Sequence, residues 1–369
     1  MTATLTYGSR VVDEDMHGIV QDLAASAAAF QDARILITGS NGYLARYLVT
    51  ALLALKDAGH APGLSLVLAQ RGAPPATDPY SRLLARDDTE LHLQDVCDPI
   101  AVGDGVDMIV HAASKASPRA YLADPVGTID VNTGATRRLL ELALEKNARR
   151  FLYFSSGEIY GDAPPEAVPT PETFPGLVDC TGPRAVYTES KRMGETIVMA
   201  FHRAHGLNAQ IVRPFHVYGP GMRLDDGRVM ADFLRCRLND DPIEILSAGL
   251  DTRAFCYIAD ATVLTLQVLA AGSPGGIYNV GNDGEHTSIC DLAELIARLE
   301  EPKMPVRVAA DPDAAHLQGT PGRVCPDMSR ARQEFGYAPS VGLEAGLRRT
   351  LAWYRENRCA VVSDRKCKT

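Results

Sequence analysis

The stretch Arg34-Ile-Leu-Ile-Thr-Gly-Ser-Asn-Gly-Tyr-Leu-Ala45 decides the fold of this chain. Its first five residues predict a buried strand, and the glycines that follow predict a tight turn into a helix over residues 43–55. Gly39, Gly42 and Ala45 match the spacing of dinucleotide-binding turns, in which the middle glycine lets the backbone approach a pyrophosphate. Because the helix N-terminus faces the phosphates, the stretch predicts a dinucleotide site at the end of the first strand.

Strand-like and helix-like segments continue to alternate downstream of this turn. Such alternation is typical of an α/β fold, here a Rossmann-type doubly wound parallel sheet with a smaller α/β substrate-binding lobe. The further strands of the sheet are expected at residues 64–69, 108–112, 151–154 and 209–212.

These patterns divide the chain into four parts. They are an N-terminal extension (1–33) with a helix over 13–30, a nucleotide-binding part (34–220), a part that is mainly the smaller lobe (221–358) and a polar, basic tail (359–369). We expect the smaller lobe to interleave with the first, so that a boundary at one residue is only approximate. Its strands are expected at 242–246, 276–280 and 305–308, and its helices at 229–238, 289–299 and 343–357.

Composition excludes several classes of function. A formal charge of −9 over 369 residues gives no basic footprint for nucleic acid. No apolar run reaches the ~20 residues of a membrane span, and the first residues lack the pattern of a signal peptide. The eight cysteines are dispersed without the spacing of a zinc site, so no metal is expected. We therefore expect a cytoplasmic protein that binds neither nucleic acid nor membrane.

The end of the second expected strand leaves the identity of the dinucleotide open. An acidic residue commonly binds the adenosine ribose of NAD at this point, but this chain has Gln70 and Arg71 there. Gln70 could bond the ribose of NAD, whereas Arg71 could meet the additional phosphate of NADP. Between the strands expected at 64–69 and 108–112, Asp95 and Val96 follow a further presumed strand, where a carboxylate can accept a hydrogen bond from the adenine amino group.

Tyr187 and Lys191 are four residues apart in a stretch predicted to be helical. This spacing places the phenol and the ammonium group on one face of a helix. A nearby cation stabilises phenolate, so we expect Lys191 to bring the pKa of Tyr187, ordinarily about 10, toward neutral pH. Such a tyrosine can remove a proton from a sugar hydroxyl.

Over about residues 34–354, the sequence resembles the extended short-chain dehydrogenases that modify nucleotide sugars. Within that family it is most similar to the UDP-glucuronate decarboxylases. The stretches that carry the resemblance are the glycine turn, His111-Ala-Ala-Ser114, Ala116-Ser-Pro-Arg-Ala-Tyr121, Asn132 in Val-Asn-Thr-Gly-Ala, Ser155-Ser-Gly-Glu-Ile-Tyr-Gly161, Gly182-Pro-Arg-Ala-Val-Tyr187, Arg213-Pro-Phe-His-Val-Tyr-Gly-Pro220, Asp226-Gly-Arg-Val229 and Asp251-Thr-Arg-Ala-Phe255.

The resemblance implies a role for each site residue. Ser156 would hold the C4 oxygen of the sugar, Tyr187 would be the base, Lys191 would tune Tyr187, and Glu158 stands where decarboxylases and 4,6-dehydratases carry a catalytic glutamate. The dinucleotide is expected to contact Gly39, Asn41, Gly42, Tyr43, Leu44, Gln70, Arg71, Asp95, Val96, Ala112, Ala113, Ser114, Asn132, Tyr187 and Lys191. The nucleotide sugar is expected to contact Tyr121, Ser156, Glu158, His216, Arg228, Arg253 and Arg323.

Three reactions remain open, because each follows from oxidation at C4 to a 4-ketosugar. A C6 carboxylate would leave as CO₂, a C6 hydroxyl could be eliminated as water, and hydride return to the other face would invert C4. Gly157 replaces the aspartate of 4,6-dehydratases and the serine typical of decarboxylases. His216 replaces a usual asparagine, and residues 245–247 lack the usual Tyr-Gly, so UDP is an extrapolation.

Two further expectations concern assembly and class. Members of the resembled family commonly dimerise through two helices, here residues 126–146 and 187–205. A non-enzymatic alternative is a dinucleotide-sensing protein that keeps the fold without turnover. The complete set of Ser156, Tyr187 and Lys191 favours the enzyme, because a sensor needs no proton acceptor beside the cofactor.

Overall fold

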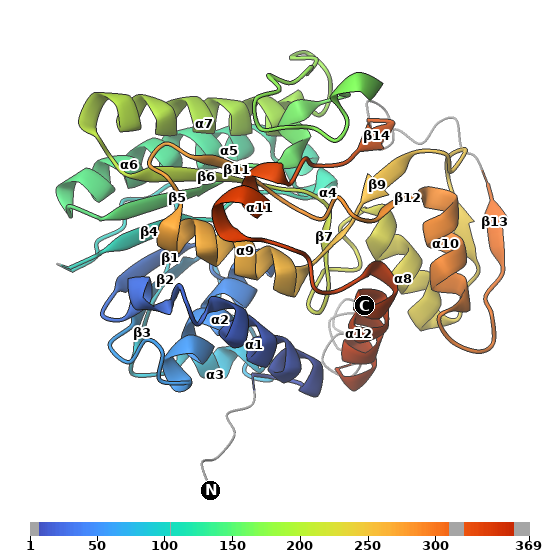
Figure 1. The fold of residues 1–369 in the computed structure, drawn as a ribbon, viewed down its shortest axis with the longest axis horizontal. Helices are drawn as coiled ribbons and strands as arrows, with labels where there is room; N and C mark the ends of the chain where they lie inside the picture. Colours follow the sequence, from blue (N-terminus) through green and yellow to red (C-terminus); the bar gives the residue numbers. More distant parts are fainter. Residues whose placement is uncertain (1–6, 104, 310–320, 358–369) are drawn as a thin grey trace, which may run out of the picture.

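A computed structural model describes residues 7–103, 105–309 and 321–357 of the chain. The expected tail over 359–369 and the first six residues of the N-terminal extension lie outside these ranges. Figure 1 shows a sheet with helices on both faces and a second lobe to its right.

Seven parallel strands form the central sheet in the order β11-β6-β5-β4-β1-β2-β3. The expected Rossmann-type sheet is confirmed. Its strands are β1 (Arg34–Thr38), β2 (Ser65–Gln70), β3 (Thr89–Leu93), β4 (Met108–His111), β5 (Arg150–Phe154), β6 (Ala209–Pro214) and β11 (Ile277–Val280).

Apolar residues occupy both faces of these strands because both faces are covered. In β1, Ile35 and Ile37 join the core beneath one set of helices, while Leu36 joins the core beneath the other. One face carries α5 (Pro125–Ile129), α6 (Thr136–Glu145) and α7 (Ala185–His205), and the other carries α2 (Tyr43–Asp57) and α9 (Ile258–Ala271), as Figure 1 shows. Shorter elements beside the sheet are α3 (Tyr80–Leu84), α4 (Pro118–Ala123), α11 (Ser329–Phe335) and the 3₁₀ turns at Gly157–Tyr160 and Pro165–Ala167.

The second lobe is built from elements that precede and follow α9. Three small sheets contribute: β12-β9-β14, the pair β13-β8 and the pair β10-β7. The strands are β7 (Val217–Tyr218), β8 (Ile243–Ile245), β9 (Thr252–Ala254), β10 (Cys256–Tyr257), β12 (His286–Ser288), β13 (Val306–Val308) and β14 (Arg323–Val324). The helices of the lobe are α8 (Val229–Asn239), α10 (Ile289–Arg298) and α12 (Leu343–Glu356).

One expected strand of the second lobe belongs to the central sheet instead. Residues 277–280 form β11, the edge strand that pairs in parallel with β6. The chain reaches it through α9, which is buried on nearly all sides and which sequence periodicity did not reveal. A helix that is apolar all round carries no amphipathic period, and this explains the omission.

The N-terminal extension contains helix α1 (Arg10–Leu23), which packs on α2, α9 and α12. The helix expected over 13–30 has different bounds. It begins earlier because the Ser9 hydroxyl accepts a hydrogen bond from the Val12 amide, at 3.3 Å, and so caps the first turn. It ends at Leu23, and a separate 3₁₀ turn, η1, spans Ala27–Phe30.

Candidate functional site

The carboxyl ends of the parallel strands bring the predicted cofactor residues to one edge of the sheet. At the end of β1, Gly39 has a φ of +68°, and a Cβ there would lie 2.6 Å from the Ala113 Cα atom. Only glycine fits so close to the chain that follows β4. The Gly42 amide then donates to the Gly39 carbonyl at 2.8 Å, and α2 begins at Tyr43 without a side-chain cap.

This geometry fits the phosphates of a dinucleotide. A helix whose first amide groups have no side-chain cap offers donors to an anion, and its dipole favours negative charge there. The turn residues Gly39 and Gly42 hold the backbone close against the chain after β4, so no side chain stands over the helix N-terminus from these positions.

At the end of β2, side-chain amides bond to the protein itself, and the ribose contact of Gln70 stays a prediction. The Gln70 side chain is buried, accepts a hydrogen bond from the Ser40 hydroxyl at 2.7 Å and donates to the Gly72 carbonyl at 2.9 Å. Asn41 also donates to the Gly72 carbonyl, at 3.3 Å, and accepts from Arg46. Both amides therefore tie the glycine turn to the loop after β2, while Arg71 is exposed.

Two predicted cofactor residues, Ser114 and Asn132, are linked to helix α7. The Ser114 hydroxyl donates to Asn132 Oδ1 at 2.9 Å, and Asn132 Nδ2 donates to the Ser190 hydroxyl at 2.9 Å. Ser190 in turn donates to the Tyr187 carbonyl at 3.1 Å. Asn132 lies in a π-helical segment, Asp130–Ala135, that interrupts the helix expected over 126–146. Such segments occur often at functional sites.

Tyr187 and Lys191 are both buried, at 5% and 1% exposure. Burial, followed by the Glu158 carboxylate, raises the pKa of Tyr187 to about 12, against the effect of a hydrogen bond with the Ser156 side chain. Lys191 Nζ donates to the Phe154 carbonyl at 2.6 Å, and burial lowers its pKa to about 7.

The prediction that Lys191 lowers the pKa of Tyr187 is therefore wrong for the protein without a bound ligand. The physical reason is that burial strips water from the phenolate, and the ammonium group of Lys191 is held at the Phe154 carbonyl. Among the protein's cations, Arg228 opposes this rise in the Tyr187 pKa, but burial and Glu158 outweigh it.

Ser156 and Glu158 lie directly after β5 and close to Tyr187. The Ser156 hydroxyl accepts from the Glu158 amide at 3.2 Å and so caps the turn η3 (Gly157–Tyr160). Glu158 Oε2 accepts from Arg184 Nη2 at 2.7 Å. The structure therefore places a carboxylate and a guanidinium beside the phenol.

Packing explains why a glycine stands at position 157. A Cβ at this position would lie 2.9 Å from the ring of Phe215, at the start of the connection between β6 and β7. A serine or aspartate at Gly157 would therefore have to displace the aromatic ring.

Tyr121 stacks on Tyr187, with ring centroids 5.2 Å apart and an interplanar angle of 13°. Its side chain is fully buried, and its hydroxyl has no hydrogen-bond partner among the described residues. The ring therefore fixes one face of the phenol.

Three arginines surround His216. Burial, followed by Arg253, Arg228 and Arg184, lowers the pKa of His216 to about 3, so the imidazole is neutral at physiological pH. Its Nδ1 atom is buried and has no partner within the described ranges. The site thus offers guanidinium groups and a neutral imidazole to an anion, a combination suited to phosphate oxygens.

The remaining predicted residues lie at the edges of this arrangement. Arg253 is buried on β9, where it donates to the carbonyls of Thr252 and Gly322, and Arg323 lies on the neighbouring strand β14. Arg228 donates to the Ala116 carbonyl at 2.9 Å. Asp95 accepts from the Cys97 amide at 2.9 Å in the turn after β3.

Comparison with known proteins decides the family. The NAD dependent epimerase/dehydratase family matches residues 35–281, which contain the glycine turn, Ser156, Tyr187 and Lys191. The chain belongs to this family. As a member it is an NAD-dependent enzyme, in agreement with the resemblance noted from the sequence.

Curated relatives of this family member are similar over most of their length. UDP-glucuronic acid decarboxylase 5 of Arabidopsis thaliana is 35% identical over 315 residues, which cover 85% of this chain and 87% of that protein. UDP-glucuronic acid decarboxylase 1 of Xenopus tropicalis is 33% identical over 326 residues, 88% of this chain and 72% of that protein.

Solved structures of the family share the fold. DesIV, a dTDP-glucose 4,6-dehydratase of Streptomyces venezuelae solved with NAD and TYD bound, has a TM-score of 0.76 at 25% identity, over 89% of this chain and 99% of that one. The UDP-glucuronic acid 4-epimerase of Bacillus cereus has a TM-score of 0.72 at 23% identity, over 88% of this chain and 99% of that one.

Arg184 and Ser190 are site residues of this family member that sequence reasoning did not single out. Arg184 directly precedes α7 and lies within the stretch Gly182-Pro-Arg-Ala-Val-Tyr187, which carries the family resemblance. Its place three residues before Tyr187 could have indicated that it belongs to the site. Ser190 lies between Tyr187 and Lys191, and nothing in the local pattern indicated its bond to Asn132.

Within the described part of the chain, no helix has the length and apolar character that a membrane crossing requires.

Proposed function

We propose that this protein decarboxylates a nucleotide-linked glucuronate, with UDP-glucuronate as the first substrate to test, through a transient 4-ketone. The observation that carries the proposal is the grouping of Tyr187, hydrogen-bonded with Ser156, beside the ion pair of Glu158 and Arg184. The names of the curated relatives support the same reaction.

In this reaction Tyr187 accepts the proton of the C4 hydroxyl, and Ser156 holds the same oxygen. When bound, NAD would supply the acceptor for the C4 hydride and the hydride donor when the ketone is reduced. The resulting ketone stands β to the C6 carboxylate, so the C5–C6 bond breaks, CO₂ leaves and its electron pair forms an enolate. Water supplies the proton that adds to C5, and Tyr187 gives its proton back to the C4 oxygen as the ketone is reduced.

Arg184, Arg228 and Arg253 are proposed to bind the anionic groups of the substrate. Their charges, together with neutral His216, favour a diphosphate and a carboxylate over an uncharged sugar. Tyr121 and Arg323 are proposed to complete the sugar-nucleotide contacts, and residues 221–358 are proposed to supply most of this second lobe. Asp95 and Val96 remain proposed contacts of the adenine.

Product analysis distinguishes the reactions. Mass spectrometry after incubation with UDP-glucuronate is expected to show a product lighter by CO₂. A product of unchanged mass would instead establish a 4-epimerase, and loss of water from UDP-glucose or dTDP-glucose would establish a dehydratase. Gly157 disfavours the dehydratase, because glycine has no acid that could give a proton to the leaving C6 hydroxyl. Binding without any turnover would favour a dinucleotide sensor.

NAD is the proposed cofactor, and we further propose that the site tolerates NADP through Arg71. The end of β2 has no carboxylate that would repel a 2′-phosphate. Arg71, the residue after β2, is exposed and so is accessible to such a phosphate.

Replacing Arg71 by Ala is therefore expected to weaken NADP binding about tenfold while leaving NAD binding unchanged, since a charge-assisted hydrogen bond contributes about 1.5 kcal/mol. Calorimetric titration with each dinucleotide measures the effect. Arg348→Ala, at an exposed arginine of α12, is the matched control. Equal losses for both dinucleotides would contradict a specific phosphate contact.

We propose a homodimer in the cytoplasm, paired through the helices of residues 126–146 and 187–205. Val126, Ile129 and Met193 support this interface, because they are apolar yet 69%, 44% and 52% exposed in the single chain. The double variant Val126→Glu, Met193→Glu is expected to be monomeric by light scattering after size exclusion. Val308→Glu, at an exposed apolar residue of the second lobe, is the control. A monomeric wild-type protein would contradict the proposal.

A further inference from the structure

Asp15, on the N-terminal helix α1, is a buried carboxylate with four hydrogen bonds. Its Oδ2 atom accepts from the hydroxyls of Tyr47 and Tyr257, at 2.9 and 2.7 Å. Its Oδ1 atom accepts from Arg349 Nε and Nη2, at 3.1 and 2.6 Å. The side chain of Asp15 is only 2% exposed.

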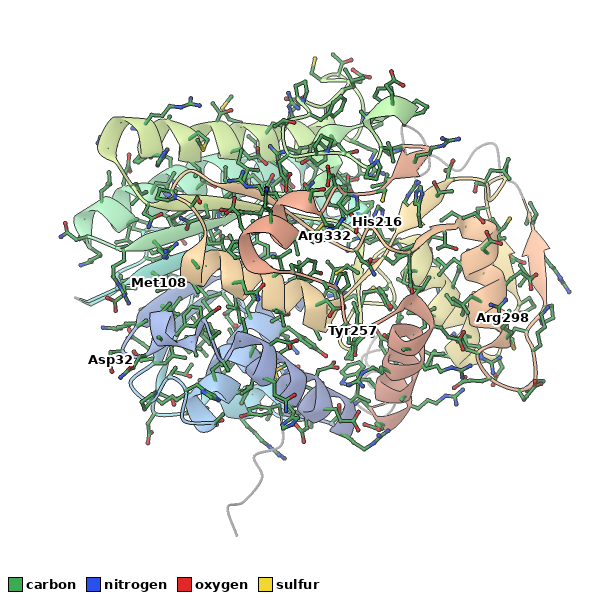
Figure 2. All side chains as sticks on the ribbon, viewed as in Figure 1. Asp32, Met108, His216, Tyr257, Arg298 and Arg332 are labelled. Carbon is green, nitrogen blue, oxygen red and sulfur yellow. The ribbon has the colours of Figure 1, made fainter. Side chains whose placement is uncertain are left out.

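The partners of Asp15 belong to parts of the molecule that are distant in sequence. Tyr47 lies on α2, one turn after the residue that starts this helix at the glycine turn. Tyr257 ends β10, four residues after Arg253, and Arg349 lies on α12. Figure 2 shows Tyr257 in the middle of the molecule, between the central sheet and the lobe that carries Arg298.

Tyr257 is also connected to His216. Strand β10 pairs in parallel with β7, so that Tyr257 stands opposite Tyr218, two residues after His216. The rings of Tyr218 and Tyr257 also meet edge to face, with centroids 5.8 Å apart. A carboxylate that holds both Tyr47 and Tyr257 therefore connects the helix of the dinucleotide turn to the strands beside His216 and Arg253.

Stability alone is a weak explanation for this carboxylate. Burial raises the pKa of Asp15, despite the opposing effects of Arg349 and the two tyrosine hydroxyls. Ionising a buried acid opposes folding, and apolar replacements of buried ion pairs often leave stability unchanged or improved. Directional bonds to three separate elements do, however, determine how those elements are placed relative to one another.

We propose that Asp15 is a positioning residue that sets the placement of the dinucleotide turn relative to the substrate contacts His216 and Arg253. Asp15 and Arg349 lie outside the matched family residues 35–281, whereas Tyr47 and Tyr257 lie within them. The inference depends on the proposed function, because its consequence is the geometry of hydride transfer between sugar and dinucleotide.

A double-mutant cycle with Tyr47→Phe and Tyr257→Phe tests the inference, because each variant removes one hydroxyl and keeps the ring. Each is expected to lower kcat about tenfold, since misplacement of reacting groups by a fraction of an ångström slows the reaction. Either loss interrupts the same connection, so the double variant should be no more than about twofold slower than the worse single variant. The Kd for NAD should stay unchanged throughout.

Tyr47→Phe combined with Tyr337→Phe is the control pair, because the Tyr337 hydroxyl donates elsewhere, to the Gly281 carbonyl at 2.9 Å. Because Tyr337→Phe is expected to leave kcat normal, this pair should be as slow as Tyr47→Phe alone. Multiplied effects in the Tyr47 and Tyr257 cycle, about 100-fold in total, would overturn the inference and leave the proposed function intact. Lower melting temperatures with unchanged kcat would likewise overturn it, since that pattern marks a purely structural role. A folded wild-type protein without turnover would overturn both proposals.

Discussion

Tyr187→Phe is expected to lower kcat by about 10²–10⁴-fold, because the phenylalanine ring cannot accept the C4 hydroxyl proton. Binding of NAD and of the nucleotide sugar should be retained. The ring of Tyr121 stacks at 5.2 Å on the residue that is replaced and would continue to support an aromatic ring there. Steady-state kinetics and calorimetric titration measure the two properties separately.

The pH dependence of the same step follows from the buried phenol. Burial raises the pKa of Tyr187 to about 12, so the phenolate needed as base is a minor form at neutral pH. Its population increases as the pH rises toward that value. We therefore expect kcat/KM of the wild-type enzyme to increase with pH through the neutral range, and the residual rate of Tyr187→Phe to lack this increase.

Tyr337→Phe provides the comparison for this prediction. It also removes a hydroxyl from a buried tyrosine, but one that donates to the Gly281 carbonyl. A normal kcat in Tyr337→Phe together with the loss in Tyr187→Phe would assign the effect to proton transfer. Wild-type rates in Tyr187→Phe would remove the basis for the proposed reaction.

Glu195→Gln is expected to destabilise the fold by about 3–5 kcal/mol, because it leaves the buried guanidinium of Arg213 without its counter-charge. Arg213 donates to Glu195 through Nε at 2.8 Å and through Nη2 at 2.6 Å, and the two side chains are 7% and 10% exposed. This pair joins β6 to α7, the helix that carries Tyr187 and Lys191. Unfolding in guanidinium chloride, followed by circular dichroism, gives the free energy.

An exposed pair in the second lobe gives the matched control for the buried one. Glu294→Gln removes the partner of Lys303, in a pair whose side chains are 47% and 60% exposed. Surface pairs contribute about 0.5 kcal/mol, so this change should be close to the error of the measurement. If Glu195→Gln were equally mild, the Arg213 charge would have to be compensated by the other groups it contacts.

The first strand, the glycine turn and helix α2 follow from local properties of residues 34–57. An apolar run, a glycine spacing and an amphipathic period each act over a few residues, so neighbours in the chain suffice to predict them. The same holds for the single helix that carries Tyr187 and Lys191, because a separation of four residues places them on one face whatever packs around them.

Long-range packing was required for the rest. The ion pair of Glu158 with Arg184, the return of β11 to the central sheet and the four bonds of Asp15 all join segments far apart in the chain. The pKa of Tyr187 is raised, and not lowered as predicted from the sequence, for the same reason. Burial depends on every layer that covers the phenol and not on its spacing from Lys191. Spacing along one chain segment has a fixed geometry, whereas contacts between segments exist only after the whole sheet and its covering helices have assembled.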